Sequence, residues 1–322
     1  MIKLMKEKVQ DIAPTRAYRD VTIELARKDP RIVNIEADLG NCIFGPDFQQ
    51  EFPDRYFDIG ICEQSLSSIA AGMSAVGLIP FAHSFAVFAS RRMCDQNYIS
   101  GAYAHRNVKI VASAPGISPG ENGGTHHALE DISIMRAMVD VIIAEPADST
   151  SMRWLVKNAA ENYGMYYIRA ERTTNSKIYD DGSEFEIGKA NIIREGSDVT
   201  LIGEGAVMLD NAMTAAEMLE KEGISARVVD IFTIKPIDKE TIAACAAETG
   251  AIVTCENHSI TGGLGTAVAD ALCDTNSVVP FRRIGIPNCF GEVGQVPELL
   301  EIMHMTPQDI ADAAKSAIAQ KK

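Results

Sequence analysis

What the sequence lacks excludes several classes of protein. No stretch of the 322 residues reaches the roughly 18 consecutive apolar residues that a membrane-spanning helix needs. The first residues include Lys3, Lys6 and Lys8 and have no apolar segment of the kind found in a signal peptide. We therefore expect a soluble, cytoplasmic protein with no membrane partner.

Cysteine is scarce and lacks metal-ligand spacing. The seven cysteines are Cys42, Cys62, Cys94, Cys245, Cys255, Cys273 and Cys289. Their number is odd and no two of them form a Cys-x-x-Cys pair, so neither a disulfide framework nor a zinc site is indicated. We expect reduced thiols and no metal ligands in this chain.

Positive charge is also in short supply. The chain has 44 acidic and 30 basic residues, which gives a net charge of −14. This acidity argues against a nucleic-acid partner, because phosphates need a basic surface. At about 100 to 200 residues per domain, the length predicts two domains that each bury a full core.

Short apolar segments alternate with helical segments along the whole chain. The predicted strands are at residues 32–36, 108–112, 141–144, 166–168, 199–202, 226–231, 251–254 and 281–286. This alternation indicates an α/β protein with two three-layer domains, in which mainly parallel sheets are covered by helices. Turn-forming residues between Thr173 and Glu186 mark the boundary. We expect domains at 1–175 and 189–322, with a linker at 176–188.

Glu63 is the first candidate functional residue. It follows a strand-like apolar run at 56–61 and begins a helix of small and apolar residues with no outward charged face, so its carboxylate should be buried. The only cation near it in the sequence is Arg55. Burial without a cation favours the protonated carboxyl, which suits a group that shares a proton with a ring nitrogen. The alternative is a carboxylate that only caps its own helix.

Two further segments carry candidate residues. Phe85 and Phe88 follow a predicted N-cap at Ser84, so both rings would share one helix face, as part of the core or as a cofactor contact. Residues 114–127 then contain four glycines and two prolines and end in two histidines. A connection so rich in turn residues is typical of a functional loop.

Taken in order, the carboxylate, the aromatic pair and the glycine-rich loop resemble the pyrimidine-binding domain of the transketolase family of thiamine diphosphate enzymes. The resemblance covers essentially the whole chain and rests on residues 58–64, 85, 88, 95–96, 120–126 and 145–148. It implies thiamine diphosphate as the cofactor, which supplies the carbanion chemistry that the protein tunes.

The resemblance also assigns cofactor contacts. By it, Glu63 hydrogen-bonds N1 of the aminopyrimidine ring, and Phe85 and Phe88 hold that ring by stacking. Asp38 and Leu39 are expected to contact the cofactor as well. His126 matches a family histidine on the carbonyl side of the donor sugar, where charge develops, and His127 beside it is expected to be a loop residue.

Substrate contacts follow from the same resemblance. Arg172 matches an arginine that grips a substrate phosphate, and Arg16 matches a second one, a role that suits the planar guanidinium. The alternative for each is a solvated surface charge. Two positions depart from the family: an acidic loop residue is Asn122 here, and a histidine at the start of the loop is Ala114. A non-standard sugar is therefore expected, with Asn122 still among the substrate-binding residues.

A diphosphate motif is missing. Complete thiamine enzymes carry a Gly-Asp-Gly sequence that binds the metal and the diphosphate, and none occurs in this chain. The chain therefore resembles the C-terminal subunit of a split transketolase, with Mg (or Ca) bound mainly by a separate N-terminal subunit. The resemblance implies transfer of a two-carbon ketol unit from a ketose phosphate to an aldose phosphate in pentose phosphate metabolism. It also implies a heterotetramer of two such chains with two partners.

Three alternatives are open. A beta subunit of a 2-oxo acid dehydrogenase shares the architecture and also lacks the diphosphate motif. A deoxyxylulose phosphate synthase has a similar pattern at 58–64 and 126–127 but is normally one long chain. A non-catalytic or nucleotide-binding subunit would rest on the turn at 203–205 with Asp230 beyond it, which half-matches a dinucleotide fingerprint.

The glycine-rich turn at 261–265 has two interpretations. It could hold an anion on free backbone N–H groups, or its glycines could only permit tight packing. His258, just before it, is left outside the catalytic set.

Overall fold

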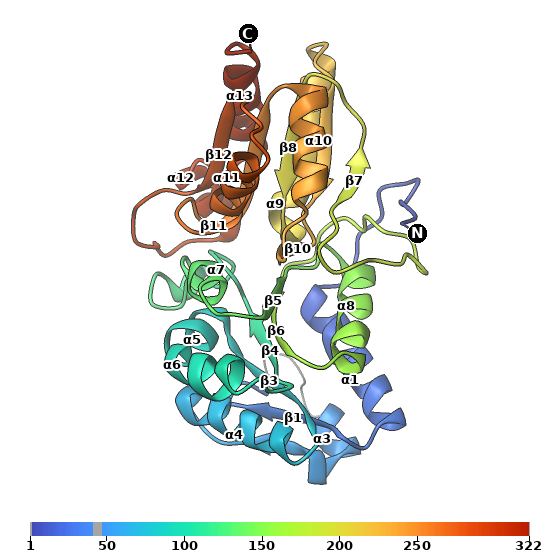
Figure 1. The fold of residues 1–322 in the computed structure, drawn as a ribbon, viewed down its shortest axis with the longest axis vertical. Coiled ribbons are helices and arrows are strands. Elements are labelled where there is room, and N and C mark those ends of the chain that lie inside the picture. The colour runs from blue at the N-terminus through green and yellow to red at the C-terminus, as the bar shows by residue number, and fades with distance from the viewer. Residues whose placement is uncertain (1, 41–46, 322) are drawn as a thin grey trace.

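The computed structural model describes residues 2–40 and 47–321. Two α/β domains follow each other along the long axis of the molecule, each built on a mainly parallel sheet with helices on both faces (Figure 1). The predicted fold class is therefore confirmed.

Within the described residues, the first sheet has seven strands. Their order is β10 (Thr233–Lys235), β5 (Val141–Ala144), β6 (Met165–Ala170), β4 (Lys109–Ser113), β3 (Ile79–Phe85), β1 (Ile32–Glu36) and β2 (Tyr56–Asp58). Neighbours pair in parallel except β10, which pairs antiparallel with β5. Because β10 comes from the second half of the chain, that half completes the edge of the first sheet. β3, β4 and β6 are buried at every residue, as expected of parallel strands covered on both faces.

Helices cover both faces of this sheet. One face carries α1 (Pro14–Lys28) and α8 (Ser149–Glu161), and the other carries α4 (Glu63–Ala75), α5 (Ala86–Arg91) and α7 (Asp131–Arg136) (Figure 1). Shorter elements are α3 (Asp47–Glu51), η1 (Pro53–Arg55), α6 (Cys94–Gln96), η2 (Asn97–Tyr103) and η3 (Gly120–Asn122).

The second domain repeats this plan. Its five strands, counted over the described part of the chain, are in the order β12 (Phe281–Ile286), β11 (Ile252–Ser259), β8 (Val199–Gly203), β9 (Ala226–Asp230) and β7 (Asn191–Arg194). One face carries α9 (Gly205–Lys221) and α13 (Pro307–Ile318), and the other carries α10 (Lys239–Thr249) and α11 (Leu264–Asp274). The remaining helix is α12 (Val296–Ile302). Each of the two apolar clusters continues from one domain into the other.

The proposed linker at 176–188 lies against the start of the chain. Isolated bridges join Leu4 to Tyr179 and Gln10 to Ser176. Together with β10, these bridges tie the two halves of the chain by backbone hydrogen bonds.

Two local predictions near the site are wrong. The strand predicted at 56–61 ends at Asp58, because Gly60 adopts a positive φ and donates its N–H to Asp58 Oδ1 at 2.9 Å, which turns the chain. Ser84 is not an N-cap. It lies inside β3 opposite Ala112, so pairing in the middle of the sheet overrides its capping preference, and α5 begins at Ala86.

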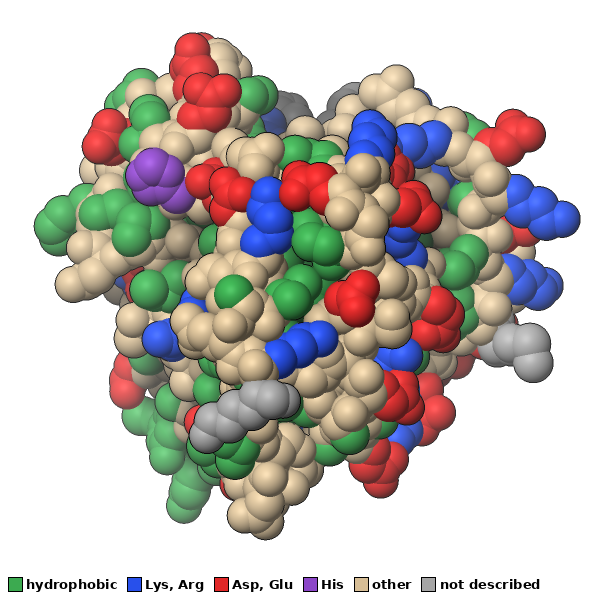
Figure 2. Space-filling view, turned by 90° about the horizontal axis from the view of Figure 1, so that it is seen from above, with side chains coloured by type: hydrophobic (Ala, Val, Ile, Leu, Met, Phe, Trp, Pro, Cys, Tyr) green, Lys and Arg blue, Asp and Glu red, His purple; other side chains and the backbone are tan. Residues whose placement is uncertain are grey.

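The surface charges, the cysteines and the length of the helices can be compared with the expectations from composition. Figure 2 shows acidic and basic side chains interspersed over the end of the molecule formed by the second domain. The six described cysteines are free, and Cys42 lies outside the described residues. Over the residues that the structure describes, we find no helix both long and apolar enough to cross a bilayer.

Candidate active site

The candidate site lies along the edge of the first sheet that is formed by the carboxyl ends of its parallel strands. Asp38 follows β1, Glu63 follows β2, Phe85 ends β3, the loop that carries His126 follows β4, and Arg172 follows β6. These strands are neighbours and all run parallel. Their carboxyl ends therefore bring together residues that span more than a third of the chain, at the edge where ligands bind in open α/β sheets.

Glu63 occupies the first position of α4. Its side chain is buried, with the residue 3% exposed, as the sequence predicted. The expectation of no cationic neighbour is wrong, because Arg92 Nη1 lies 3.0 Å from Glu63 Oε1. Arg92 is 29 residues away and directly follows α5, whereas Arg55 donates to the carbonyls of Ala26 and Asp29.

The structure does not support the alternative role of Glu63 as a helix cap. The N-cap of α4 is Cys62, and no side chain makes a capping hydrogen bond there. Among the described residues, nothing donates a hydrogen bond to Oε2 of Glu63. One oxygen of a buried carboxylate is thus held by a cation, and the other is available to a ligand.

Phe85 and Phe88 are connected to this carboxylate through Arg92. They do not share one helix face, since Phe85 ends β3 and Phe88 is in α5, but their ring centroids are 6.2 Å apart. The His126 ring meets both edge-on, at 6.1 Å from Phe85 and 5.4 Å from Phe88. The guanidinium carbon of Arg92 lies 3.9 Å from the centre of the Phe88 ring. Carboxylate, cation, rings and imidazole therefore form one continuous set of contacts.

The two histidines of the loop have different surroundings. His126 is partly exposed, and its Nδ1 lies 2.9 Å from Thr125 Oγ1. His127 is buried, with Nε2 3.3 Å from the carbonyl oxygen of Gly120, and burial lowers its pKa. His126 is therefore the histidine that faces the candidate site, while His127 packs inside the loop.

Two arginines lie at the same edge. Arg172 is exposed, with its guanidinium carbon 5.9 Å from the centre of the Phe85 ring. Arg16 is exposed on the first turn of α1, next to Thr15, whose N–H donates to the carbonyl of Glu171 at 3.1 Å. In the described part of the chain, neither arginine forms an ion pair. Both remain free to bind an anionic substrate.

The remaining predicted residues border this edge. Asn122 ends η3 with an exposed side chain that makes no hydrogen bond to any described residue. Asp38 has a positive φ and donates its N–H to Asp58 Oδ1 at 3.0 Å. Leu39 donates its N–H to the buried carboxylate of Glu36 and packs against the cluster that includes Phe85. Burial raises the pKa of Glu36.

The glycine turn at 203–205 is filled by protein. A Cβ at Gly205 would collide with the Glu145 carboxylate of the first domain. Asp230 is fully buried and accepts a 2.5 Å hydrogen bond from the Tyr179 hydroxyl, while burial raises its pKa to about 7. Neither group is open to a dinucleotide, so the geometry does not support the nucleotide-binding alternative.

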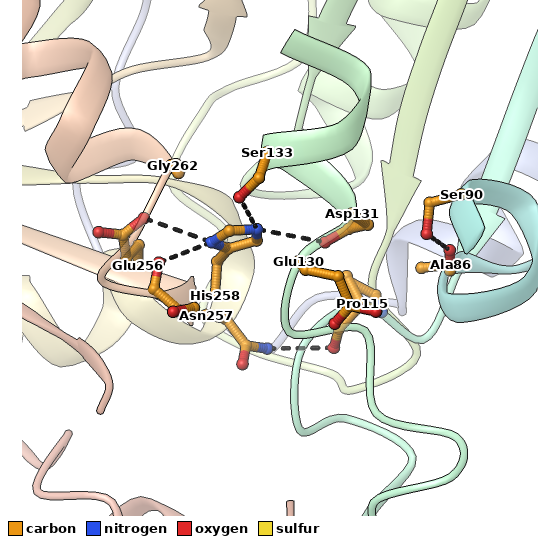
Figure 3. Close-up of polar contacts among 12 residues, drawn as sticks. Ala86, Ser90, Pro115, Glu130, Asp131, Ser133, Glu256, Asn257, His258 and Gly262 are labelled. Atoms are coloured by element: carbon orange, nitrogen blue, oxygen red, sulfur yellow. Dashed lines mark hydrogen bonds and ion pairs between the residues drawn. The ribbon is translucent and has the colours of Figure 1, made fainter. Parts of the chain in front are cut away.

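The second glycine turn is occupied by a carboxyl group of the chain itself. The N–H of Gly265, at the start of α11, donates to Glu256 Oε1 at 3.0 Å. His258 is buried between the domains, 3.4 Å from Ser133 Oγ and 3.9 Å from Asp131 Oδ1 (Figure 3). Burial lowers its pKa to about 4, so it is neutral at pH 7. The turn is therefore structural.

The sequence analysis missed a buried charge cluster at the domain boundary. Arg169 is fully buried; its Nε donates to Asp131 Oδ2 at 2.9 Å and its Nη2 to the carbonyl of Asn257 at 2.9 Å. Glu145 and Glu204 also contact this guanidinium. Burial raises the pKa of both glutamates. An arginine within the apolar run at 165–170 was the available signal, because a buried arginine requires partners.

Two family models match most of the chain. The model described as "Transketolase, pyrimidine binding domain" matches residues 10–176, and the one described as "Transketolase, C-terminal domain" matches residues 188–310.

Individual relatives agree with these matches. The chain is 44% identical over 304 residues to a 6-deoxy-6-sulfo-D-fructose transketolase subunit of Clostridium sp. (strain MSTE9), covering 94% of each chain. It is 38% identical over 278 residues to one of the subunits of an apulose-4-phosphate transketolase from Phocaeicola vulgatus, covering 86% of this chain and 88% of that one. A solved structure described as "Split gene transketolase, inactive beta4 tetramer" superposes with a TM-score of 0.88 at 40% identity, covering 97% and 100% of the two chains.

Proposed function

Because this chain belongs to the transketolase family of thiamine diphosphate enzymes, we propose that it is the C-terminal subunit of a split transketolase. With an N-terminal subunit that binds Mg and the diphosphate, it transfers a two-carbon ketol unit from a ketose to an aldose. Two similar relatives of matching length are named as transketolase subunits, which favours this function over a deoxyxylulose phosphate synthase or a 2-oxo acid dehydrogenase subunit.

The observation that carries the proposal is the Glu63 carboxylate. It is buried at a helix start, Arg92 holds one of its oxygens, and the other has no donor among the described residues. The oxygen without a donor can accept a hydrogen bond from a protonated ring nitrogen. Phe85 and Phe88 are connected to it through Arg92 and offer the apolar surface that an aminopyrimidine ring would contact.

Each group of the chain then has a defined task. When bound, thiamine diphosphate supplies the carbanion chemistry of the reaction. Glu63 holds a proton at the ring nitrogen, and the two phenylalanines fix the orientation of the ring, together with Asp38 and Leu39 at the neighbouring strand end. His126 lies against both rings and donates toward the side of the substrate where negative charge develops.

The substrate should carry a strong anion. Arg16 and Arg172 are exposed and make no ion pair within the described residues, and a guanidinium binds phosphate with two parallel hydrogen bonds. The names of two relatives refer to a sulfo-sugar and to a sugar phosphate, which are both anionic. We infer a ketose phosphate as the donor, with Asn122 free to contact its hydroxyl groups.

The outer face of α4 supports self-association. Beyond Glu63 the helix has no charged residue, and it packs beside η2. Large apolar side chains are exposed on these two elements and their flanks: Ile61, Ile69, Val76, Tyr98, Ile99 and Tyr103. Such a face is suited to a second copy of the chain, and we propose an assembly of two of these chains with two N-terminal subunits. We place this assembly in the cytoplasm, where its described free cysteines would stay reduced.

Calorimetry with thiamine diphosphate and Mg tests the proposal. We expect no tight binding by this chain alone and binding after a candidate N-terminal subunit is added, followed by turnover of a ketose phosphate. Tight binding by the chain alone would contradict the split site. Absence of binding in the mixture, with a partner that co-elutes, would contradict the assignment of the cofactor. The Glu63→Ala variant in the same mixture is the control for binding at the proposed ring site.

A further inference from the structure

Asn257, in the second domain, makes all its side-chain hydrogen bonds to the substrate loop at 114–127. It lies near the end of β11 and is 2% exposed. Its Oδ1 accepts the N–H of Ile117 at 3.0 Å, and its Nδ2 donates to the carbonyl of Pro115 and to Ser118 Oγ, both at 3.3 Å (Figure 3 for Pro115). One amide thus holds the start of a loop that lies 140 residues away in the chain.

The loop is shaped to receive this amide. Gly116 has a positive φ, and a Cβ at that position would collide with Asn257 Oδ1 and with the Asn257 carbonyl. Glycine is therefore required there both for backbone conformation and for space. The fit between Gly116 and Asn257 determines where the loop begins.

The contact continues to the arginine that we assign to the substrate. Ser118 Oγ accepts from Asn257 and donates to Glu171 Oε2 at 2.5 Å, so its hydroxyl is used in both directions. Oε1 of the same Glu171 accepts the N–H of Arg172 at 2.8 Å. Asn257 is therefore linked through two side chains to the backbone that carries Arg172.

Asn257 is itself fixed in place. Its carbonyl accepts from Arg169, whose guanidinium is buried and also bound to Asp131. Because this guanidinium is buried and held by carboxylates on several sides, it fixes the Asn257 carbonyl in place. The amide therefore transmits the position of the second domain to the loop that carries Asn122 and His126.

We propose that Asn257 is a positioning residue that holds the substrate loop and Arg172 in the positions that bind the donor sugar. The kinetic part of this inference rests on the proposed function. Asn257 contacts none of Glu63, Phe85 and Phe88, so cofactor affinity should not depend on it. Through Asn257, the C-terminal domain would position the loop that binds the donor sugar.

The test uses Asn257→Ala and Asn257→Asp in the full chain. Asp keeps the acceptor for Ile117 but loses both donations, so it should fall between Ala and the wild type. Ser118→Ala removes the hydrogen bonds of Ser118 Oγ to Asn257 and to Glu171. It keeps the bond from Ile117 N–H to Asn257 Oδ1, so the Ile117 amide should stay protected. The matched control is Ser133→Ala. It removes hydrogen bonds between the domains, to the Thr261 carbonyl at 2.9 Å and to His258 Nε2 at 3.4 Å, without touching the loop.

Two readouts are measured. Amide hydrogen exchange of the chain reports the loop directly, and we expect exchange at Ile117 to speed about tenfold in Asn257→Ala, as the loss of one buried hydrogen bond predicts. In the assembled enzyme we expect the donor KM to rise about tenfold while the Kd of thiamine diphosphate changes less than about twofold. Ser133→Ala should leave both quantities at wild-type values.

The outcomes separate this inference from the proposed function. Unchanged exchange at Ile117 in both Asn257 variants would overturn the anchoring role. If Ser133→Ala speeds exchange at Ile117 by the same factor, the effect reflects a general loss of stability and the anchoring role is also overturned. If Asn257→Ala does not fold, Asn257→Asp and Ser118→Ala decide the question by the donor KM. A rise in both supports the positioning role, and wild-type values in both overturn it. A wild-type assembly that turns over no ketose would refute the proposed function. Hydrogen exchange at Ile117 would still show whether Asn257 anchors the loop.

Discussion

Arg92 Nη1 lies 3.0 Å from Glu63 Oε1, so a half-exposed arginine holds one oxygen of a buried carboxylate. The same guanidinium lies over the Phe88 ring, with its carbon 3.9 Å from the ring centre. One cation thus fixes the relative position of the carboxylate and an aromatic ring that belong to different helices. The geometry of the site therefore depends on Arg92 as well as on Glu63.

Glu63→Ala should abolish turnover and leave fold and assembly intact. General acid–base groups contribute about 10²- to 10⁴-fold to rates, and a loss in that range is expected. The fold should survive because Arg92 is half-exposed and regains water when its partner is removed. Steady-state kinetics, circular dichroism and sedimentation are the measurements. Glu51→Ala, which removes the partner of the exposed Arg27, is the control; full activity in Glu63→Ala would refute the assignment.

Arg92→Met should weaken the binding of thiamine diphosphate by the assembled enzyme. It removes the partner of Glu63 and the cation over Phe88, each worth about 0.5 to 1 kcal/mol when partly exposed, so an increase in Kd of about fivefold to thirtyfold is expected. Calorimetry measures the change. Arg27→Met, which breaks an exposed ion pair with Glu51 away from the site, should keep the wild-type Kd. Equal affinities in all three proteins would contradict the role of Arg92.

Asn122→Asp should improve turnover of ordinary ketose phosphates. The side chain is exposed and makes no hydrogen bond to any described residue, so the acid can replace it without disturbing the loop. It restores the charge that the family carries at this position. The measurement is kcat/KM for a set of ketose phosphates, with Asn122→Ala as the control for loss of the amide. The idea fails if kcat/KM does not rise for any of them.

The contribution of Asp230 to stability should fall as the pH rises from about 5 to about 8. Burial raises the pKa of Asp230 to about 7, whereas an unfolded aspartate titrates near about 3.9. The folded protein therefore keeps a proton that the unfolded chain releases. The resulting stabilisation is fully present below the unfolded pKa and is lost as pH rises through the folded one.

Urea unfolding at several pH values measures this effect. Asp230→Asn has no proton to lose and should flatten the slope by up to about 3 kcal/mol across this range. Burial also raises the pKa of Glu204, so part of the slope should remain. Asp210→Asn, on the partly exposed side of α9, should keep the wild-type slope. If the dependence of unfolding free energy on pH is unchanged in Asp230→Asn, the folded protein does not hold a proton on Asp230 in this range.

The sequence by itself determined the fold class and much of the strand pattern. The strands predicted at 32–36, 141–144 and 281–286 have the bounds found in the structure. Continuous apolar runs are the local signature of parallel strands buried on both faces, and this signature is complete within each segment. The sequence also predicted the burial of Glu63 from the uncharged helix that it begins.

Only the tertiary structure decided which groups meet. Arg92 reaches Glu63 across 29 residues, Asn257 reaches Ile117 across 140, and β10 crosses into the sheet of the other domain. Each of these contacts joins elements whose own patterns are complete without it. Periodicity reports which face of a strand or helix is buried, but the partner on that face depends on how distant elements pack, which no local pattern contains.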